Sequence, residues 1–144
     1  MVKIRIAFPE DALPLTRLCR DALGYDYPPE RLSEKLARIS ADPGQRVFVA
    51  VSEEGLPVGF IHTQVYDVLY APTMLNILGL AVDASCRRQG IGRALLSAAE
   101  LDARHRGIGG VRLVSGQERT GAHRFYEQNG YQRSKTQLNL KKKL

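Results

Sequence analysis

The chain has 144 residues, a formal net charge of +6, 44% hydrophobic side chains and 25% charged ones. These values are ordinary for a globular protein with a sizeable core, and we expect one domain over residues 1–144. No apolar run approaches the length of a membrane span and no signal-peptide pattern opens the sequence, so we expect a cytoplasmic protein without membrane contact. Cys19 and Cys86 stand at no metal or redox spacing, and we expect no metal site.

The first half of the chain predicts a strand, two helices and a β-hairpin. Apolar residues spaced three and four apart indicate the helices, and β-rich segments indicate the strands. Asp11 is a candidate N-cap, Gly24 ends the first helix, and Gly59 suggests a bulge. In chain order we expect a strand at 3–7, a helix between Asp11 and Gly24, a helix between Pro29 and Asp42, and strands at 46–52 and 57–66.

The second half alternates strands and helices. A strand, a crossover helix and a second strand predict a parallel pair, 74–82 with 111–115. On the crossover helix we expect Ile91, Leu95 and Leu101 on the buried side. A last helix at 120–128 and a last strand at 131–140 complete the order. The pattern predicts an α/β fold with a mixed central sheet of six or seven strands flanked by four helices on both faces.

A polar turn joins the strand at 74–82 to the crossover helix. It reads Arg87-Arg88-Gln89-Gly90-Ile91-Gly92, and Arg93 follows. Two glycines at a strand-to-helix turn let a ligand approach the backbone. Amides without helical partners, the helix dipole and the arginines all favour an anion. The turn therefore predicts a phosphate-binding site, although a plain connection between strand and helix is the alternative.

Two common phosphate motifs do not fit this turn. A dinucleotide fingerprint needs glycine or alanine where Leu95 stands, and a P-loop needs Lys-Ser/Thr where Arg93-Ala94 stand. What remains is Arg-x-x-Gly-x-Gly directly after an apolar strand. This pattern closely resembles the acetyl-CoA signature of the GNAT family of N-acetyltransferases.

A second segment, 122–131, reads AHRFYEQNGY. It resembles the other GNAT signature, an Ala-x-x-Phe-Tyr-Glu helix that ends at Gly-Tyr or Gly-Phe. In that family the tyrosine lies beside the CoA sulfur and acts as general acid on the leaving thiolate, and the resemblance assigns this role to Tyr126. Phe125 reads as a core aromatic, and the same reading is the alternative for Tyr126.

The resemblance implies acetyl-CoA as co-substrate. The pantetheine arm would pair with the backbone of the strand at 74–82, and a backbone N–H near Leu80 would polarise the acetyl carbonyl. The cofactor-binding residues implied in this way are Leu80, Ala81, Val82, Arg87, Arg88, Gln89, Gly90, Ile91, Gly92 and Arg93.

For the acceptor, the resemblance implies the loop Tyr25-Asp26-Tyr27, the segment 66–72 and Asn76. Their tyrosines and aspartates would suit a cationic amine such as an aminoglycoside, polyamine or amino-acid derivative, and surface turns are the alternative. Some family members carry a glutamate as general base where this chain has Asn76, which cannot accept a proton. The candidates that stay open for this base are Asp26, Asp67, His62 and Glu118.

The function implied is transfer of the acetyl group of acetyl-CoA to a primary amine of a small molecule, by direct attack in a ternary complex. Protein N-terminal or lysine acetylation is a second reading, and an acyl-CoA-binding or nucleic-acid-binding module is a third. Apart from Lys141–Lys143, the basic residues are scattered and show no interleaved aromatics, so we expect no nucleic-acid partner. A homodimer remains open.

Overall fold

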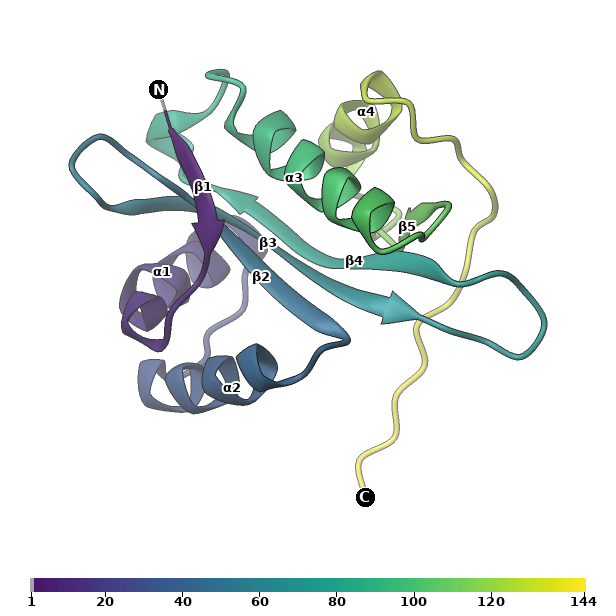
Figure 1. Cartoon of the computed structure of the whole chain (residues 1–144), viewed down its shortest axis with the longest axis horizontal. Coiled ribbons are helices and arrows are strands. Elements are labelled where there is room, and N and C mark those ends of the chain that lie inside the picture. Colours follow the sequence, from purple (N-terminus) through teal and green to yellow (C-terminus); the bar gives the residue numbers. More distant parts are fainter. Residues whose placement is uncertain (1) are drawn as a thin grey trace. The chain divides into compact units, whose positions relative to one another are not determined.

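A five-stranded mixed sheet is the frame of the computed structural model, which describes residues 2–144 (Figure 1). The strand order in space follows the chain, β1-β2-β3-β4-β5. The first three neighbouring pairs are antiparallel, and β4–β5 is parallel because a crossover helix connects them. The strands are β1 (Lys3–Ile6), β2 (Gln45–Val51), β3 (Pro57–Tyr66), β4 (Met74–Val82) and β5 (Val111–Leu113).

Helices cover both faces of this sheet. Figure 1 shows α1 and α2 on one face and α3 on the other, which confirms the predicted α/β arrangement. Short 3-10 turns, η1 and η2, precede α1 and α3. The helices are α1 (Ala12–Leu23), α2 (Pro29–Ala41), α3 (Ile91–His105) and α4 (Thr120–Gln128), and the short turns are η1 (Pro9–Asp11) and η2 (Ala84–Cys86).

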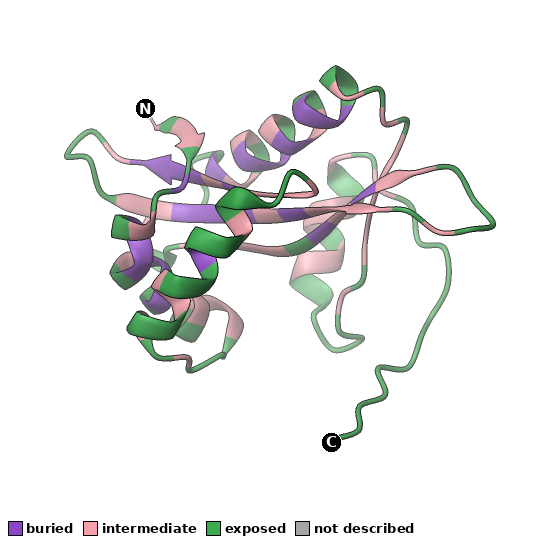
Figure 2. Cartoon of the chain, turned by 60° about the horizontal axis from the view of Figure 1, so that its bottom comes forward, coloured by how far each residue is buried: buried purple, intermediate pink, exposed green. Residues whose placement is uncertain are grey.

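The chain forms two compact units, one ending at Leu113 and the other running Val114–Leu144. In the first, buried residues lie in the strands and on the sides of the helices that face them (Figure 2). Alternate residues of β2 point toward α1 and α2, because side chains in a strand alternate between its two faces. The core on this face is Ala7, Leu15, Leu18, Leu36, Val47, Val49, Val51, Phe60 and Ala81.

The opposite face packs against α3 where β3 carries a glycine. A Cβ on Gly59 would lie 3.1 Å from Leu95 Cδ1 and 3.3 Å from Ile91 Cγ2, so the missing side chain lets the helix approach the strand. The predicted bulge is present beside it, since Ala50 pairs with Gly59 and the next β2 residue skips Val58. Leu101 was expected on the buried side of α3, but it is exposed. Asp102 and Ala103 are the buried residues at this end of the helix.

The second unit contains α4, and its C-terminal segment has no regular structure. The prediction of a strand at 131–140 is wrong. Within residues 2–144 the sheet has five strands, not the predicted six or seven. Every residue from Gln132 to Leu144 is exposed (Figure 2). From Gln132 to Leu140 the segment has only two apolar side chains, Leu138 and Leu140, so it has little apolar surface with which to pack on a sheet.

Candidate active site

Between β4 and α3 the chain makes the polar turn that was predicted to bind phosphate. β4 ends at Val82, and Asp83 Oδ1 accepts hydrogen bonds from the amide of Ser85 at 2.9 Å and from its hydroxyl at 2.6 Å. These hydrogen bonds hold the pKa of Asp83 below its ordinary value. Arg88 has a φ of +64°, a left-handed conformation that non-glycine residues rarely adopt. Such backbone strain clusters at functional segments.

The start of α3 presents backbone amides. Gly90, with a φ of +77°, occupies the N-cap position and brings no side chain to cap the helix. The hydrogen bond from the Ala94 amide to the Gly90 carbonyl, at 3.0 Å, is the first of the helix. The amides of Ile91, Gly92 and Arg93 therefore have no partner one turn earlier in the helix. Gly92, predicted in the turn, is the second residue of α3.

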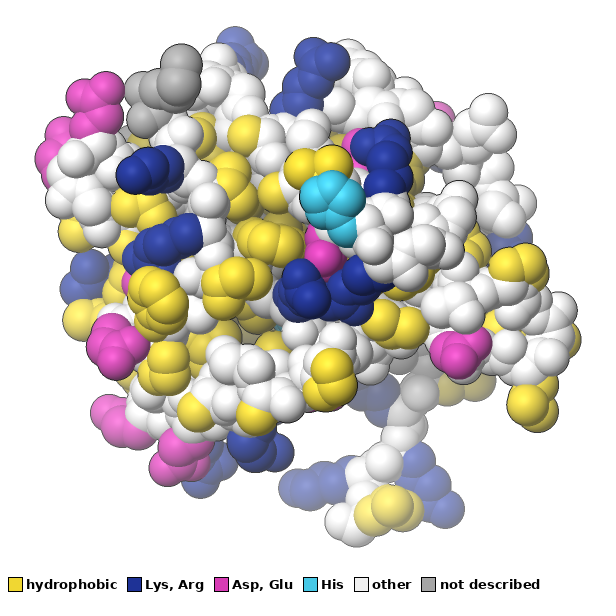
Figure 3. All heavy atoms as spheres, viewed as in Figure 1, with side chains coloured by type: hydrophobic (Ala, Val, Ile, Leu, Met, Phe, Trp, Pro, Cys, Tyr) yellow, Lys and Arg dark blue, Asp and Glu magenta, His cyan; other side chains and the backbone are white. Residues whose placement is uncertain are grey.

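Positive charge surrounds this helix start. Arg87, Arg88 and Arg93 are exposed, as is Gln89. The Ile91 side chain is only 3% exposed, so this residue offers a ligand its backbone alone. Across the face drawn in Figure 3, Lys and Arg side chains are scattered among apolar ones. The turn thus combines helix amides with full charges, the arrangement that holds a phosphate.

Beside this turn, the last residues of β4 have a strand neighbour on one side only within the described chain. β5 pairs with β4 only over 75–77, while β3 continues alongside the rest of β4. Leu78 is an extra residue of β4, at a bulge opposite the step from His62 to Thr63. Edge strands offer unpaired N–H and C=O groups to an extended ligand. Within the described chain, the segment 78–82 is therefore such an edge.

Three residues predicted to contact the cofactor lie on that edge. Ala81 is buried in the core that faces α1 and α2, and Leu80 and Val82 are half-buried. Their side chains are thus engaged in packing, so these residues offer a ligand mainly their backbone N–H and C=O groups.

The end of α1 lies over β4 next to the bulge. A Cβ on Gly79 would lie 3.8 Å from Leu23 Cδ1 and 3.6 Å from Phe60 Cε2. Gly24, with a φ of +78°, ends the helix as predicted, and its amide bonds to the Arg20 carbonyl. The loop predicted to bind the acceptor thus leaves α1 close to the bulge of β4.

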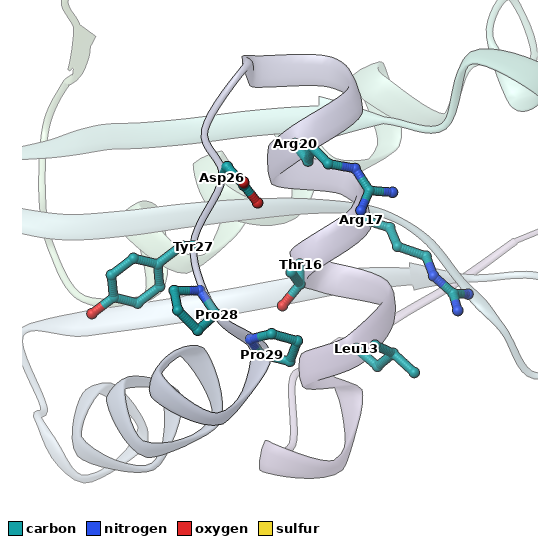
Figure 4. Close-up of a pocket in the computed structure, with 8 residues that line it drawn as sticks. All are labelled: Leu13, Thr16, Arg17, Arg20, Asp26, Tyr27, Pro28 and Pro29. Atoms are coloured by element: carbon teal, nitrogen blue, oxygen red, sulfur yellow. The ribbon is translucent and has the colours of Figure 1, made fainter.

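That loop lines a groove on its α1 side (Figure 4). Asp26 points toward α1, whereas the Tyr27 ring points away and lies under the Lys35 ammonium, 5.0 Å from its centre. Tyr25 is 69% exposed. Of the two arginines at the groove, Arg20 pairs with Asp21 outside it, with Arg20 Nε 3.0 Å from Asp21 Oδ1. The groove is lined by Leu13, Thr16, Arg17, Arg20, Asp26, Tyr27, Pro28 and Pro29.

Asn76 belongs to a polar cluster that the sequence did not predict. Arg112 of β5 stands opposite it, and Arg112 Nη1 donates to Asn76 Oδ1 at 2.8 Å. The guanidinium lies over the Tyr66 ring, 4.1 Å from its centre. Arg112 interrupts the apolar strand Val111–Leu113, and this single charge was the signal available in the sequence.

A second polar chain crosses β2 and β3. His62 Nε2 lies 2.8 Å from Gln45 Oε1, and Gln45 Nε2 donates to Asp42 Oδ2 at 3.0 Å. Because the Asp42 carboxylate only accepts, the Gln45 oxygen faces His62, and His62 Nε2 carries the proton. Burial lowers the pKa of His62, so its ring is neutral at pH 7 and Nδ1 keeps a lone pair.

Tyr126 lies on α4, in the unit Val114–Leu144. Its ring makes edge contacts with Phe125 at 5.2 Å and with Tyr131 at 5.6 Å between ring centres. Burial raises the pKa of the Tyr126 phenol, and the charge of Arg119 offsets only part of that effect. The hydroxyl therefore holds its proton at neutral pH.

Other candidates for the base are engaged or exposed. Asp67 accepts a hydrogen bond from the Thr73 hydroxyl at 2.9 Å inside the exposed loop between β3 and β4. Asp26 and Glu118 are exposed. Only His62 combines burial, a defined proton position and a place opposite Gly79, next to the bulge.

In residues 2–144, no three His, Cys, Asp or Glu side chains gather where they could hold a metal ion. No helix in this part of the chain is long and apolar enough to cross a membrane.

A family model matches most of this chain. Residues 12–131 match the model of the acetyltransferase (GNAT) family. The uncharacterized N-acetyltransferase YhdJ of Bacillus subtilis (strain 168) is 48% identical over 52 residues. These are 36% of this chain and 37% of that protein, so the match spans about a third of the relative's length.

Two solved structures share the fold. A transcriptional regulator from Bacillus halodurans C-125 has a TM-score of 0.88 and 26% identity, over 98% of this chain and 99% of its own. The aminoglycoside N-acetyltransferase AAC(6')-Iy, bound to the bisubstrate analogue CoA-S-monomethyl-acetylneamine, has a TM-score of 0.86 over 100% of this chain and 99% of its own. At 16% identity, that second likeness concerns the fold alone.

The family match runs through both segments whose motifs predicted it, the turn after β4 and the helix α4. The chain belongs to the acetyltransferase (GNAT) family.

Proposed function

We propose that this protein transfers the acetyl group of acetyl-CoA to a primary amine of a small molecule, by direct attack in a ternary complex. The observation that carries the proposal is the edge of β4 at 78–82, which leads into a helix start with free amides and three arginines. The strand edge suits the extended, amide-containing pantetheine arm of CoA, and the helix start beside it suits the pyrophosphate. The two compact units would act together as one domain, and the family match extends over both.

In this proposal the CoA pyrophosphate binds the amides from Gly90 to Arg93, with Arg87, Arg88 and Gln89 around it. The pantetheine arm lies along Leu80 to Val82 as an added strand, so that its amides pair with backbone groups. A backbone N–H near Leu80 then polarises the acetyl carbonyl and stabilises the oxyanion that forms when the amine attacks.

The chemistry requires two proton movements. The amine nitrogen forms a bond to the carbonyl carbon, the carbon–sulfur bond breaks, and the thiolate takes a proton from the Tyr126 hydroxyl. The attacking nitrogen loses a proton in the same reaction. Asn76 cannot accept it, and we assign this step to His62 Nδ1 through water, because that ring is neutral and stands opposite Gly79.

A small-molecule acceptor is supported by the fold shared with an aminoglycoside N-acetyltransferase, although that likeness extends to the fold alone. The acceptor would enter over the sheet face of Asn76, below the loop Tyr25-Asp26-Tyr27. The position of Leu23 over Gly79 supports this, because it brings the start of that loop to the bulge.

The test is turnover with acetyl-CoA against panels of amines and peptides, with detection of the free thiol, together with calorimetry of acetyl-CoA binding. Gly92→Glu adds bulk and negative charge at the helix start, and we expect it to abolish acetyl-CoA binding. Gly109→Glu is the matched control, since it adds the same charge at an exposed glycine with open space around it, beyond the other end of α3. A folded Gly92→Glu protein with unchanged affinity would exclude the phosphate site. Thiol release with peptides alone would replace the small-molecule acceptor by a protein.

A further inference from the structure

The cluster around Arg112 carries a charge that the acetyl-transfer reaction does not require. Its guanidinium is half-buried, stacked on Tyr66 at 4.1 Å and bonded to Asn76 at 2.8 Å. None of the ion pairs formed among residues 2–144 includes Arg112. Among the described residues, Arg112 thus has a hydrogen bond and a ring contact, but no carboxylate partner.

The hydrogen bond to Asn76 also determines which group of its side chain is left to donate. Asn76 uses its oxygen to accept from Arg112, which leaves the amide N–H₂ as a donor. The Tyr66 ring lies against the guanidinium but offers it no acceptor oxygen in that contact, and a guanidinium carries five N–H donors, of which the hydrogen bond to Asn76 uses one. The cluster therefore presents donors and positive charge together, which is the recognition chemistry of a carboxylate.

The cluster lies on the sheet face where the acceptor is proposed to bind. Asn76 is paired with Gln64 of β3 and with Arg112 of β5, and cross-strand partners point to the same face. His62, two residues before Gln64, shares this face, and it stands opposite Gly79. Asn76 and Leu80 pair with Gln64 and Ile61 of β3, which are three residues apart and therefore span about 10 Å at roughly 3.3 Å per residue. The arginine side chain extends over part of that length.

We propose that Arg112 and Asn76 form a subsite for a carboxylate of the acceptor, and that the acceptor is therefore an amine that also carries a carboxylate several ångströms away. This inference rests on the proposed acetyl transfer and narrows its substrate class. A glutamate at position 76 would attract a cationic acceptor. The guanidinium beside Asn76 repels one, so polyamines and aminoglycosides are disfavoured.

A matched trio of acceptors tests this subsite: aminohexanoate, hexylamine and diaminohexane. They share a chain length and a reacting amine, and their far ends are negative, neutral and positive. We expect wild type to prefer aminohexanoate over hexylamine by about 10- to 100-fold in kcat/KM, the range for a hydrogen bond to a charged group. Diaminohexane should be the poorest. Calorimetry in the presence of CoA should give the same order without requiring turnover.

Three variants and a control identify the source of the preference. Arg112→Gln should reduce the ratio of aminohexanoate to hexylamine to near one, whereas Arg112→Lys should retain part of it. Asn76→Asp places a carboxylate against Arg112 and neutralises it, and should also remove the preference. Arg104→Gln removes an exposed arginine near the end of α3 and should leave the ratio unchanged. Melting curves check that each variant is folded.

The outcomes separate this inference from the proposed function. Equal constants for the three acceptors in wild type, or an undiminished preference in Arg112→Gln, would overturn the carboxylate subsite while acetyl transfer stands. If wild type acetylates no amine, the proposed function fails. In that case the ratio of the calorimetric dissociation constants for aminohexanoate and hexylamine tests the subsite separately. A binding preference that is lost in Arg112→Gln but kept in Arg104→Gln still supports the subsite.

Discussion

The buried carboxylate of Asp11 obtains its partners from residues shortly before it in the chain. Asp11 stands at the N-cap position of α1, as predicted, yet its side chain does not cap that helix. It accepts two hydrogen bonds from the Arg5 guanidinium, at 2.8 and 3.0 Å, and one from the Phe8 amide. Burial alone would raise the pKa of Asp11, but these bonds lower it below its ordinary value. The sequence thus indicated where Asp11 lies relative to α1, whereas its hydrogen-bond partners, seen only in the structure, keep its carboxylate charged.

The burial of His62 predicts that the folded protein loses stability at acidic pH. Burial depresses its pKa in the folded state, so below about pH 6.5 the unfolded chain binds a proton that the native state resists. The contribution is therefore fully present above pH 6.5 and is lost as pH falls. The thermal midpoint of wild type should drop more between pH 7.5 and pH 5 than that of His62→Gln, which keeps a partner for Gln45. Equal drops in the two proteins would mean that His62 protonates freely in the folded state.

Tyr126→Phe tests the proposed general acid. The variant keeps the ring contacts with Phe125 and Tyr131 and removes only the hydroxyl, so the fold should survive. We expect a loss of roughly 10²–10⁴ in the single-turnover rate, with acetyl-CoA affinity little changed, because the proton is needed only in the transition state. Single-turnover kinetics exclude product release as the limiting step. Wild-type rates would reduce Tyr126 to a packing residue.

At the scale of elements, α3 is oriented by its contacts with the sheet. Asp102 is 8% exposed, and its Oδ1 lies 2.7 Å from Arg46 Nη1 of β2, while Arg106 Nε lies 3.3 Å from its Oδ2. These two ion pairs hold Asp102 on the side of α3 that faces the sheet, and Leu101 is exposed. Gly59 lets the other end of the helix approach β3. Both contacts position the helix start that is proposed to hold the pyrophosphate.

Two glycines on neighbouring strands give a matched test of this packing. A Cβ on Gly59 would lie 3.0 Å from the Ala81 carbonyl oxygen, a backbone atom that cannot move easily, as well as against α3. Gly59→Ala should lower the free energy of unfolding by about 1–3 kcal/mol. Gly79→Ala meets side chains only at 3.6 Å and beyond, and should change it by less than about 0.5 kcal/mol. Equal losses in chemical denaturation would contradict the role of Gly59.

At the scale of the whole molecule, the net charge of +6 favours anionic ligands. Apart from the lysine tail, the basic residues are distributed along the chain. Those that lie at the proposed CoA site are the arginines next to the start of α3. These arginines are exposed, so salt screens them.

Acetyl-CoA binding should therefore weaken as salt rises. The Debye length falls from about 10 Å at 0.1 M to 3 Å at 1 M ionic strength, which removes most of the attraction between exposed arginines and phosphates. Acetyl-pantetheine, which lacks the phosphates, is the control and should bind with little salt dependence. The two dissociation constants can be followed by calorimetry across a salt series. Parallel salt dependence for both ligands would argue against a phosphate site at the turn.

Local patterns in the sequence were sufficient for several elements. The strand Met74–Val82 and the helix Thr120–Gln128 have the predicted bounds, because apolar runs, helical spacing and flanking glycines act over a few residues. The parallel pairing of β4 with β5 followed from the crossover helix. The family was also accessible, since both motifs are short and contiguous, and the family match confirms it.

Only the tertiary structure decided which distant residues meet. Arg112 and Asn76 are 36 positions apart, and their contact depends on the register of β4 with β5, which no local pattern specifies. The extra residue Leu78 likewise follows from pairing with β3. The segment 131–140 was predicted as a strand, yet it pairs with no strand within residues 2–144. Local propensity therefore determined where elements begin and end, whereas strand pairing and burial decided the bulge, the outward side of α3 and the charge beside Asn76.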